Sequence, residues 1–427
     1  MPKLVIRGKN RLAGKITVQG SKNSSLPIIA ATLLAGGEYH IDNVPDILDV
    51  RKMLGILKDL GSRVDFTDSK LKIRTADRID AGDMPDCRKL RASILMMGVL
   101  MGRRGCFDMP YPGGCRLGTR PVNYHIAGLK QYGAMIEETE SSIFGKCDSL
   151  TGCEYTFAYP SIGALENMIL AGVLATGSTI LNNCAKEPEV CDLCDFLRKM
   201  GAKIYGDGTD TIVIEGVDKL TPADYVIPGD RIVAGTYMIA CAVVGGNILI
   251  QKIEPRRVLY LTKLLKKTGC HVFTDSVNNE IITLADGGGR AVPYICARPY
   301  PEFPTDLQPQ TMVLLSVLHG SSKLKDEVFV ERYGTAKELA KMGADIQVEE
   351  DGVYIKGSAR LTGTTVKAGN LRQGAALVIA ALAADGITII EECRHIMRGY
   401  EDIARDMRRL GADIVWKNET ENVDISG

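Results

Sequence analysis

The sequence predicts an α/β protein of two domains, in which sheets surround buried helices as in a barrel turned inside out. Three observations predict this fold: a short phrase occurs six times, the copies pair across the middle of the chain, and each copy follows a nearly uncharged helix. The phrase places Leu or Met four residues before a Gly and a strand-forming residue three after it. Its glycines are Gly61, Gly133, Gly201, Gly269, Gly343 and Gly411, separated by 72, 68, 68, 74 and 68 residues. Such regular spacing indicates one supersecondary unit used six times.

Each phrase has the composition of the end of an amphipathic helix. A Lys or Arg occupies the last turn, and the Gly can adopt the left-handed conformation that ends a helix. The first three glycines precede the last three by 208, 210 and 210 residues. We therefore expect two similar halves of ordinary domain size, facing a cleft of the kind that commonly holds a ligand.

Each unit is expected to open with an apolar helix, turn at a Gly, and continue as a strand, an amphipathic helix and further strands. The apolar helices are predicted at Ser24–Ala35, Ala92–Met101, Ala164–Ala175, Ile232–Val244, Gln310–His319 and Gly374–Ala384. Helices that are apolar nearly all round belong inside a shell of other elements. The uncharged stretch Ile232–Ile250 has the length of a membrane span. However, Thr236 and the Gly245–Gly246 pair favour a buried helix, a turn and a strand.

Composition narrows the class of protein. The chain has 427 residues with 52 basic and 52 acidic side chains, a balance that argues against nucleic acid or a membrane surface as a general partner. Twelve scattered cysteines and a start unlike a signal peptide predict a cytoplasmic protein with free thiols. No Walker loop, Rossmann fingerprint, nucleophile elbow or metal-ligand spacing occurs. We interpret the isolated Cys191–Cys194 pair as structural or incidental, and His125 and His395 as structural or binding residues.

Polar and cationic residues precede the six apolar helices. They are Gly20–Asn23, Leu90–Arg91, Ser161–Gly163, Gly229–Arg231, Thr305–Asp306 and Gly369–Arg372. Ordinary capping by Ser24, Ser161 or Asp306 would explain the short polar side chains. It would not explain a Lys or Arg at four of the six starts, because the helix dipole disfavours cations there. Since helix N-termini attract anions, the pattern predicts a multiply anionic ligand.

Three further clusters contain candidate site residues. The stretch Arg103–Arg120 is rich in Gly, Pro and Arg and contains Cys115, which fits either a mobile lid bearing a thiol or an ordinary surface loop. Arg332 follows an apolar segment, and Arg398 precedes the last amphipathic helix. A single Arg is more often a solvated surface charge, but equivalent positions in several units favour a shared site.

Several motifs resemble those of the enolpyruvyl transferase family. They are Ser21–Asn23 with Leu26–Pro27, Arg91–Ser93, Gly113–Pro121, Phe303–Asp306, Arg372 and Arg398–Tyr400. The resemblance covers essentially the whole chain. It implies the two-domain inside-out α/β barrel of that family, with three repeats in each domain. Residues 22–229 would form domain I, which carries the Cys115 loop; residues 1–21 and 230–427 would form domain II, with the active site in the cleft.

The resemblance also implies an activity. The enolpyruvyl group of phosphoenolpyruvate would pass to the 3′-hydroxyl of UDP-N-acetylglucosamine with release of phosphate, the first committed step of peptidoglycan synthesis. Lys22, Arg120 and Arg398 would hold the phosphate of phosphoenolpyruvate. Arg332 and Arg372 would hold its carboxylate, where the planar fork of Arg is useful. No metal or organic cofactor is implied.

Two residues would exchange protons with the substrates. Asp306 would act as the base toward the sugar hydroxyl, and Cys115 as the acid toward the methylene carbon. A Cys at this position also implies alkylation by fosfomycin. The nucleotide-sugar site would comprise Asn23, Arg91, Arg120, Pro121, Val122, Asn123, Tyr124, Ser161, Ile162, Gly163, Asp306 and Val328.

The chain departs from the family pattern at Asn370, Asn123 and Tyr159, where Asp, Asp and Lys are common. An amide at position 370 cannot accept a proton, so an impaired or divergent paralogue that binds nucleotide sugars without turnover is one alternative. The other alternative is a sister enzyme like EPSP synthase, which acts on shikimate 3-phosphate. The thiol-bearing loop argues against that sister. The oligomeric state is not predicted.

Overall fold

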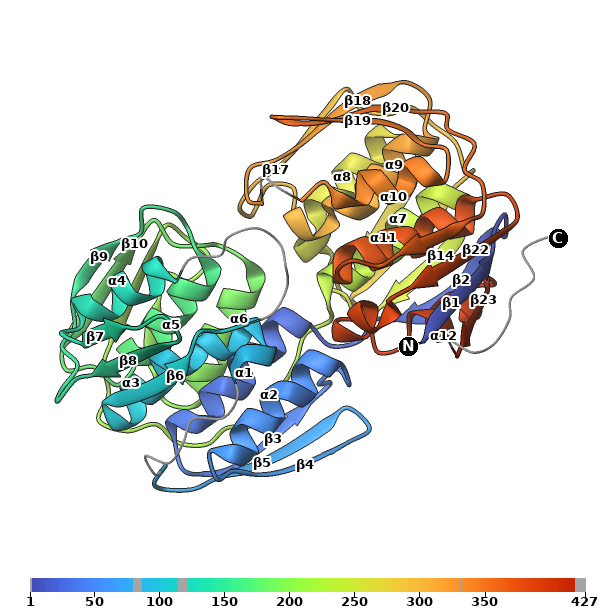
Figure 1. The fold of residues 1–427 in the computed structure, drawn as a ribbon. Coiled ribbons are helices and arrows are strands. Elements are labelled where there is room, and N and C mark those ends of the chain that lie inside the picture. Colours follow the sequence, from blue (N-terminus) through green and yellow to red (C-terminus); the bar gives the residue numbers. More distant parts are fainter. Residues whose placement is uncertain (1, 80–86, 114–121, 330–331, 419–427) are drawn as a thin grey trace. The chain divides into compact units, whose positions relative to one another are not determined.

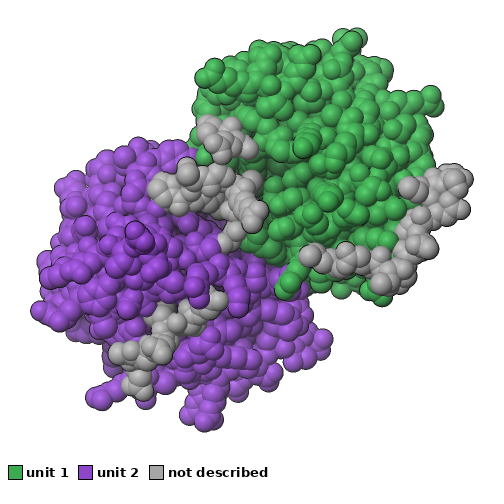
Figure 2. Space-filling view, viewed as in Figure 1, with its two compact units in different colours: residues 1–19, 116–118, 229–427 green, residues 20–115, 119–228 purple. Residues whose placement is uncertain are grey.

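The structure is a computed structural model that describes residues 2–79, 87–113, 122–329 and 332–418 (Figure 1). Contacts divide the chain into two compact units (Figure 2). Unit 1 contains the described residues among 1–19 and 229–427, and unit 2 those among 20–115 and 119–228. Each unit has its own hydrophobic core.

Three buried helices form the centre of each unit (Figure 1). They are α1 (Lys22–Ala31), α3 (Met96–Arg104) and α5 (Ile162–Gly172) in unit 2, and α7 (Arg231–Val244), α9 (Gln308–Val317) and α11 (Leu371–Ala383) in unit 1. In α7, 13 of the 14 residues are buried, and in α11, 12 of 13. The prediction of apolar helices inside a shell is therefore confirmed.

The boundaries of some helices differ from the prediction. The second apolar segment is divided into a 3-10 turn, η3 (Arg91–Leu95), and α3, and α1 continues into η1 (Thr32–Leu34). The stretch Ile232–Ile250 consists of α7, a turn at Gly245 and strand β14 (Gly246–Gln251), as expected. Among the described residues, no helix combines the length and apolar character that crossing a membrane requires.

Six small sheets cover these helices. In unit 2, the first sheet has the strand order β13 (Tyr225–Val226), β3 (Gly37–Asp42), β5 (Lys70–Thr75) and β4 (Arg63–Thr67). The second has the order β6 (Cys106–Pro110), β8 (Ser142–Lys146) and β7 (Met135–Glu138). The third has the order β9 (Glu154–Thr156), β10 (Ser178–Asn182), β12 (Thr211–Glu215) and β11 (Lys203–Tyr205). In unit 1, the first sheet has the strand order β2 (Leu12–Thr17), β14, β16 (Glu280–Ala285) and β15 (His271–Asp275). The second has the order β17 (Tyr294–Ala297), β18 (Ser321–Asp326), β20 (Gly352–Lys356) and β19 (Asp345–Glu349). The third has the order β21 (Thr365–Lys367), β22 (Ile387–Glu391), β1 (Lys3–Arg7) and β23 (Asp413–Lys417).

One strand order recurs in all six sheets. Within each repeat, the strand that follows the buried helix pairs antiparallel with the last strand of the repeat. That last strand also pairs antiparallel with the strand between them in sequence. In the last sheet, β1 takes the place of that last strand, between β22 and β23. The start of the chain thus completes the repeat at its end.

Amphipathic helices connect the strands within each repeat. They are α2 (Leu48–Asp59), α4 (Asn123–Gln131), α6 (Pro188–Lys199), α8 (Leu259–Lys267), α10 (Gly334–Lys341) and α12 (Ile403–Arg409). Each ends at one of the six phrase glycines, whose φ angles lie between 87° and 103°. At Gly61, the N–H of Ser62 donates to the carbonyl of Leu57 over 2.9 Å, and the equivalent bond forms at the other five. The predicted left-handed Gly at the helix end is confirmed, and the hydrogen bonds define it as a Schellman motif. The first residue of the phrase is fully buried in every copy.

Candidate active site

The buried helices of unit 1 begin at polar or charged side chains. Asp230 caps α7, accepting the N–H groups of Ile232 and Val233 at 2.8 and 3.1 Å. Asp306 lies in η5 (Thr305–Leu307), directly before α9, and does not cap it; its carboxylate accepts a hydrogen bond from Arg372 instead. The capping explanation of Asp306 is therefore wrong, because an ion pair within the unit takes the carboxylate.

Asp306 lies between two arginines of the same unit. Arg332 Nη1 is 2.9 Å from Oδ1, and Arg372 Nη2 is 2.6 Å from Oδ2. The two arginine side chains are 3% and 5% exposed and the aspartate 25%. Burial by itself raises the pKa of Asp306, but the charges and hydrogen bonds of Arg372 and Arg332 outweigh it and hold the pKa well below its usual range. In this arrangement Asp306 is a carboxylate and a weak base.

A buried carboxylate, Asp326, is linked to this cluster through the hydroxyl of Thr305. Arg332 Nη1 also donates to Thr305 Oγ1 at 2.9 Å, and the Thr305 hydroxyl donates to Asp326 Oδ2 at 2.6 Å. Asp326 is fully buried, and its Oδ1 accepts the N–H groups of Val328 and Phe329 at 3.0 and 2.8 Å. One carboxylate thus orders both the hydroxyl beside Arg332 and the chain that approaches Arg332.

Sequence reasoning missed Asp326, although a signal was present. In β18, Ser322, Leu324 and Asp326 alternate with more exposed neighbours and face the core. A carboxylate at the inward position of a strand is costly unless it is fully hydrogen-bonded. Such a position marks a residue that orders its surroundings.

Asn370, the departure from the family pattern, caps α11. Its Oδ1 accepts the N–H groups of Arg372 and Gln373 at 3.1 and 3.0 Å, and its Nδ2 donates to Gln373 Oε1 at 3.3 Å. Gln373 Nε2 in turn approaches the carbonyls of Lys367 and Gly334 at 3.4 and 3.5 Å. Both ends of the amide therefore have structural partners.

Arg398 is the last residue of η6 (Cys393–Arg398), a 3-10 segment that packs on α11, and its side chain is half-buried. Two residues further on, the buried Tyr400 places its hydroxyl 2.8 Å from Thr236 Oγ1 of α7. Burial raises the pKa of Tyr400, and the charge of Arg372 acts in the opposite direction. Segments far apart in the sequence thus meet at the N-terminal ends of the buried helices of unit 1.

In unit 2, Lys22 begins α1 and is held by a carboxylate. Its Nζ is 2.7 Å from Asp49 Oδ2 of α2, and the two side chains are 12% and 2% exposed. The cap of α1 is Ser21 and not Ser24, whose hydroxyl donates to Asp192 at 2.7 Å. Asn23, next to Lys22, is half-buried.

His125 is buried in unit 2 and bonded to a core amide. Its Nδ1 lies 2.7 Å from Asn167 Nδ2, which also donates to the carbonyl of Ile94. Burial, with a smaller contribution from the charge of Arg91, lowers the pKa of His125 to about 3. The ring is therefore neutral, and a Cβ added at Gly163 would lie 3.2 Å from it. His125 is a core residue that lies beside Gly163, one of the predicted nucleotide-sugar residues.

The remaining predicted residues of unit 2 differ in exposure. Ser161 caps α5 over 3.4 Å and Ile162 is 38% exposed. At the start of α4, Val122 is buried, Asn123 exposed and Tyr124 half-buried. Cys115, Arg120 and Pro121 lie outside the described residues.

The predicted loop from Arg103 to Arg120 is shorter than expected. Arg103 and Arg104 end α3, and Cys106–Pro110 form β6, which pairs with β8. A lid that begins at Arg103 is therefore wrong, because seven of the first eight residues belong to a helix and a sheet and the eighth, Gly105, caps the helix. The pair Cys191–Cys194 lies in α6 as expected, and no group of potential metal ligands occurs within the described part of the chain.

Sequence reasoning also missed a cluster of acids in unit 2. Glu166 of α5 and Glu187 and Glu189 at the start of α6 are all buried. Burial, followed by the negative charges of Glu189 and Glu187, raises the pKa of Glu166 well above its usual range. Unit 2 therefore contains a cluster of three buried acidic side chains.

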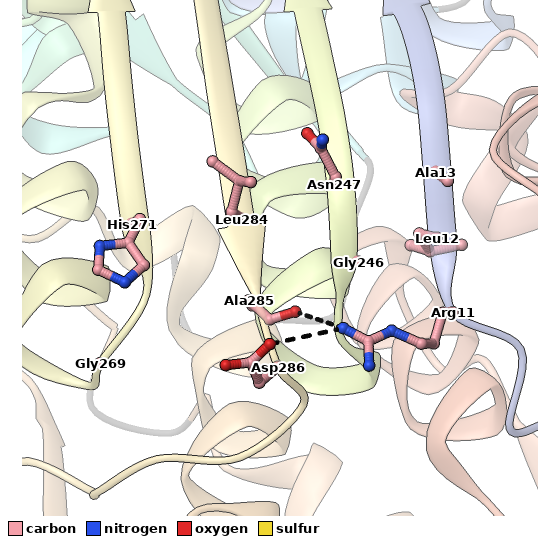
Figure 3. Close-up of a pocket in the computed structure, with 10 residues that line it drawn as sticks. All are labelled: Arg11, Leu12, Ala13, Gly246, Asn247, Gly269, His271, Leu284, Ala285 and Asp286. Atoms are coloured by element: carbon pink, nitrogen blue, oxygen red, sulfur yellow. Dashed lines mark hydrogen bonds and ion pairs between the residues drawn. The ribbon is translucent and has the colours of Figure 1, made fainter.

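Two surface hollows lie away from these helix starts. One, of about 510 Å³, is in unit 1, where Arg11 donates to the carbonyl of Ala285 at 3.1 Å and pairs with Asp286 at 3.7 Å (Figure 3). It includes Gly246, just beyond the C-terminal end of α7, and the helix separates it from Asp230 by about 20 Å. The other, of about 430 Å³ in unit 2, includes Arg103 near the end of α3. Helix C-termini do not attract anions, so we place the candidate site at the N-terminal ends.

Comparison with known proteins identifies the class. The profile of the EPSP synthase family (3-phosphoshikimate 1-carboxyvinyltransferase) matches residues 6–407. The crystal structure of the enolpyruvyl transferase NikO from Streptomyces tendae is similar with a TM-score of 0.87 and 26% identity, covering 97% of this chain and 99% of that one. EPSP synthase from Acinetobacter baumannii shares the fold, with a TM-score of 0.78 and 19% identity over 97% and 99% of the two chains. The fold is that of the enolpyruvyl transferases, as predicted.

Sequence relatives are more specific. The protein named UDP-N-acetylglucosamine 1-carboxyvinyltransferase 2 of Caldanaerobacter subterraneus subsp. tengcongensis is 44% identical, covering 97% of this chain and 99% of its own. UDP-N-acetylglucosamine 1-carboxyvinyltransferase of Geotalea uraniireducens is 40% identical over 97% and 99%. This chain belongs to the UDP-N-acetylglucosamine 1-carboxyvinyltransferase branch of the EPSP synthase family.

Proposed function

We propose that this protein transfers the enolpyruvyl group of phosphoenolpyruvate to the 3′-hydroxyl of UDP-N-acetylglucosamine, in the cytoplasm, as a step of peptidoglycan synthesis. The names of its full-length relatives support these substrates. The structural observation that carries the proposal is Asp306 held between Arg332 and Arg372. This cluster combines a potential base with two donors suited to a planar carboxylate.

Phosphoenolpyruvate would be bound through both of its anionic groups. Arg332 and Arg372 would take the carboxylate, and Lys22, Arg120 and Arg398 the phosphate. Arg332 Nε is buried and has no hydrogen-bond partner among the described residues. A buried donor without a partner favours binding of an additional acceptor.

The nucleotide sugar would be bound largely by unit 2. The proposed contacts are Asn23, Arg91, Arg120, Pro121, Val122, Asn123, Tyr124, Ser161, Ile162 and Gly163, with Asp306 and Val328 from unit 1. The proposal requires residues 22–229, as domain I, and residues 1–21 with 230–427, as domain II, to act on the same pair of substrates.

The reaction proceeds by addition and elimination. Asp306 takes the proton of the sugar hydroxyl as its oxygen bonds to C2 of phosphoenolpyruvate, while Cys115 gives a proton to C3. The result is a tetrahedral ketal. Loss of a proton from C3 and cleavage of the bond between C2 and the phosphate oxygen then release inorganic phosphate and the enolpyruvyl ether. Exclusion of water would strengthen each charge interaction in the site.

Phosphate release with two acceptors tests the proposal. The protein is incubated with phosphoenolpyruvate and either UDP-N-acetylglucosamine or shikimate 3-phosphate. Release with the nucleotide sugar alone, lost in Cys115→Ala and Asp306→Ala, is the expected result. Release only with shikimate 3-phosphate would favour the sister activity. Affinity for the nucleotide sugar without turnover at high protein concentration would favour the divergent binder, which Asn370 suggests.

A further inference from the structure

Asp306 occupies the donors that the proposed substrate needs. It accepts from Nη1 of Arg332 and Nη2 of Arg372. Both guanidinium groups belong to side chains that are at most 5% exposed, so they have few alternative directions. An incoming carboxylate would meet Arg332 Nη1 and Arg372 Nη2 already occupied, with only the buried Nε of Arg332 lacking a partner among the described residues.

Two carboxylates cannot share these donors without a cost. Like charges repel strongly in a poorly solvated site, and each carboxylate is stabilised mainly by the hydrogen bonds it accepts from guanidinium. Binding of the substrate carboxylate at Arg332 and Arg372 therefore favours departure of Asp306 from them. The two events are an exchange of one anion for another.

The surroundings permit this exchange. Asp306 caps no helix and lies in a 3-10 segment of three residues, and its side chain is the most exposed of the three, at 25%. Arg332 keeps an anchor when Asp306 leaves, because Nη1 also donates to Thr305 Oγ1. Thr305 is itself held by the buried Asp326. The aspartate can thus move while the arginine remains in position.

We propose that Asp306 is an internal competitor for the carboxylate of phosphoenolpyruvate, which displaces it from Arg332 and Arg372 and so frees it to accept the hydroxyl proton. The inference rests on the proposed function and adds a coupling to it. In the absence of phosphoenolpyruvate, the two arginines suppress the basicity of Asp306. After the exchange that suppression is lost, and the O–H bond of the acceptor breaks with its proton passing to Asp306.

Binding without turnover tests this coupling. The affinity of wild type, Asp306→Asn and Asp306→Ala for phosphoenolpyruvate is measured by calorimetry in the absence of any acceptor. We expect both variants to bind about tenfold more tightly, because the internal competitor is gone, although both lose turnover. Equal or weaker binding by the variants, with an active wild type, would overturn the inference while leaving the proposed function intact. A wild type that neither binds nor turns over phosphoenolpyruvate would refute the proposed function and this inference together.

Two controls separate competition from a general change in charge. Asp230→Asn removes a carboxylate near Arg372 while retaining a good cap for α7, and we expect its affinity to change by no more than about twofold. In Asp306→Ala, added acetate should restore the competition and weaken phosphoenolpyruvate binding more than chloride does at the same ionic strength. If acetate and chloride have the same effect, or Asp230→Asn matches Asp306→Asn, direct competition is excluded.

Discussion

The two units hold their proposed substrate-binding cations in different ways. In unit 1, one carboxylate, Asp306, is shared by Arg332 and Arg372. In unit 2, Lys22 has the nearly buried Asp49 as its ion-pair partner. Clustered cations are stable in a folded chain only with internal counter-charges. We therefore expect the cluster in unit 1, which has two arginines to one carboxylate, to receive an anion more readily than Lys22, which is paired with Asp49.

The acidic groups extend this contrast. Burial and neighbouring carboxylates raise the pKa of Glu166 in unit 2, and burial lowers the pKa of His125 there. In unit 1 the arginines lower the pKa of Asp306 so far that it stays ionised at working pH. The protonation states in unit 2 should therefore change at milder acidity than that of Asp306, with opposite effects on stability at Glu166 and His125.

The largest effect on turnover is expected from substitution of Lys22 in unit 2. Lys22→Ala should lower turnover by about 10³-fold, because it removes a charge proposed to stabilise the transferring phosphate. Lys22→Arg keeps the charge and should retain part of the activity. Phosphate release under saturating substrates measures both. A loss below tenfold in Lys22→Ala would show that the lysine serves only its pair with Asp49.

The next effect concerns acid and His125. The folded pKa of His125, about 3, lies below its ordinary value of 6.5, so the unfolded chain binds more protons at this residue between these values. The contribution of His125 to stability therefore falls as the pH drops below 6.5, by about 2 kcal/mol between pH 7 and 5. His125→Asn can still accept from Asn167 but does not titrate in this range. Its melting temperature should fall less over that interval than that of wild type, and an equal fall in both proteins would contradict the assignment.

A smaller effect tests the support of Arg332 in unit 1. Thr305→Val removes the hydroxyl that links Arg332 to Asp326 at almost constant volume. We expect KM for phosphoenolpyruvate to rise about tenfold with little change in kcat, since the lost contact orients a binding residue in ground and transition states alike.

Matched variants distinguish this role from a loss of packing. Thr305→Ser restores the oxygen and should recover most of the affinity. Thr388→Val makes the same change at a buried Thr of β22 whose hydroxyl has no hydrogen-bond partner among the described residues, and should leave KM unaltered. An equal KM in Thr305→Val and wild type would remove Asp326 and Thr305 from the substrate-binding machinery.

The smallest effect is expected at Asn370. In the wild type, Gln373 Oε1 accepts a hydrogen bond from Nδ2 of Asn370. Asn370→Asp keeps the cap of α11 but places a carboxylate oxygen, in place of that donor, opposite Gln373 Oε1. We expect turnover to change by no more than about threefold, because the contacts of this amide are structural. The double variant Asn370→Asp with Gln373→Ala relieves the opposed oxygens and should match or exceed the single variant. A large gain in turnover from Asn370→Asp alone would show that the amide impairs the chemistry.

Local signals explain why much of the fold was predictable. The phrase around Gly201 describes a helix end in which the N–H of Ala202 reaches the carbonyl of Leu197 over 3.0 Å. All of its interactions lie within a few residues, so composition and spacing suffice to identify it. The apolar faces of α7 and α11 were equally visible, because a helix buried on all sides has no polar stripe. The assignment of residues 1–21 to the second domain came only from the resemblance. The place of β1 between β22 and β23 was not predicted, since a single strand does not specify its neighbours.

By itself, the sequence determined the repeat, the buried helices and the cations at their N-termini. Only the tertiary structure decided which charges meet: Asp306 and Arg372 are 66 residues apart and lie 2.6 Å from each other. It also identified Asp326 and Asp49 as the carboxylates that hold the proposed binding residues. The physical reason is that local hydrogen bonds depend on neighbours in the chain, whereas the partner of a buried charge is selected by packing among elements distant in sequence.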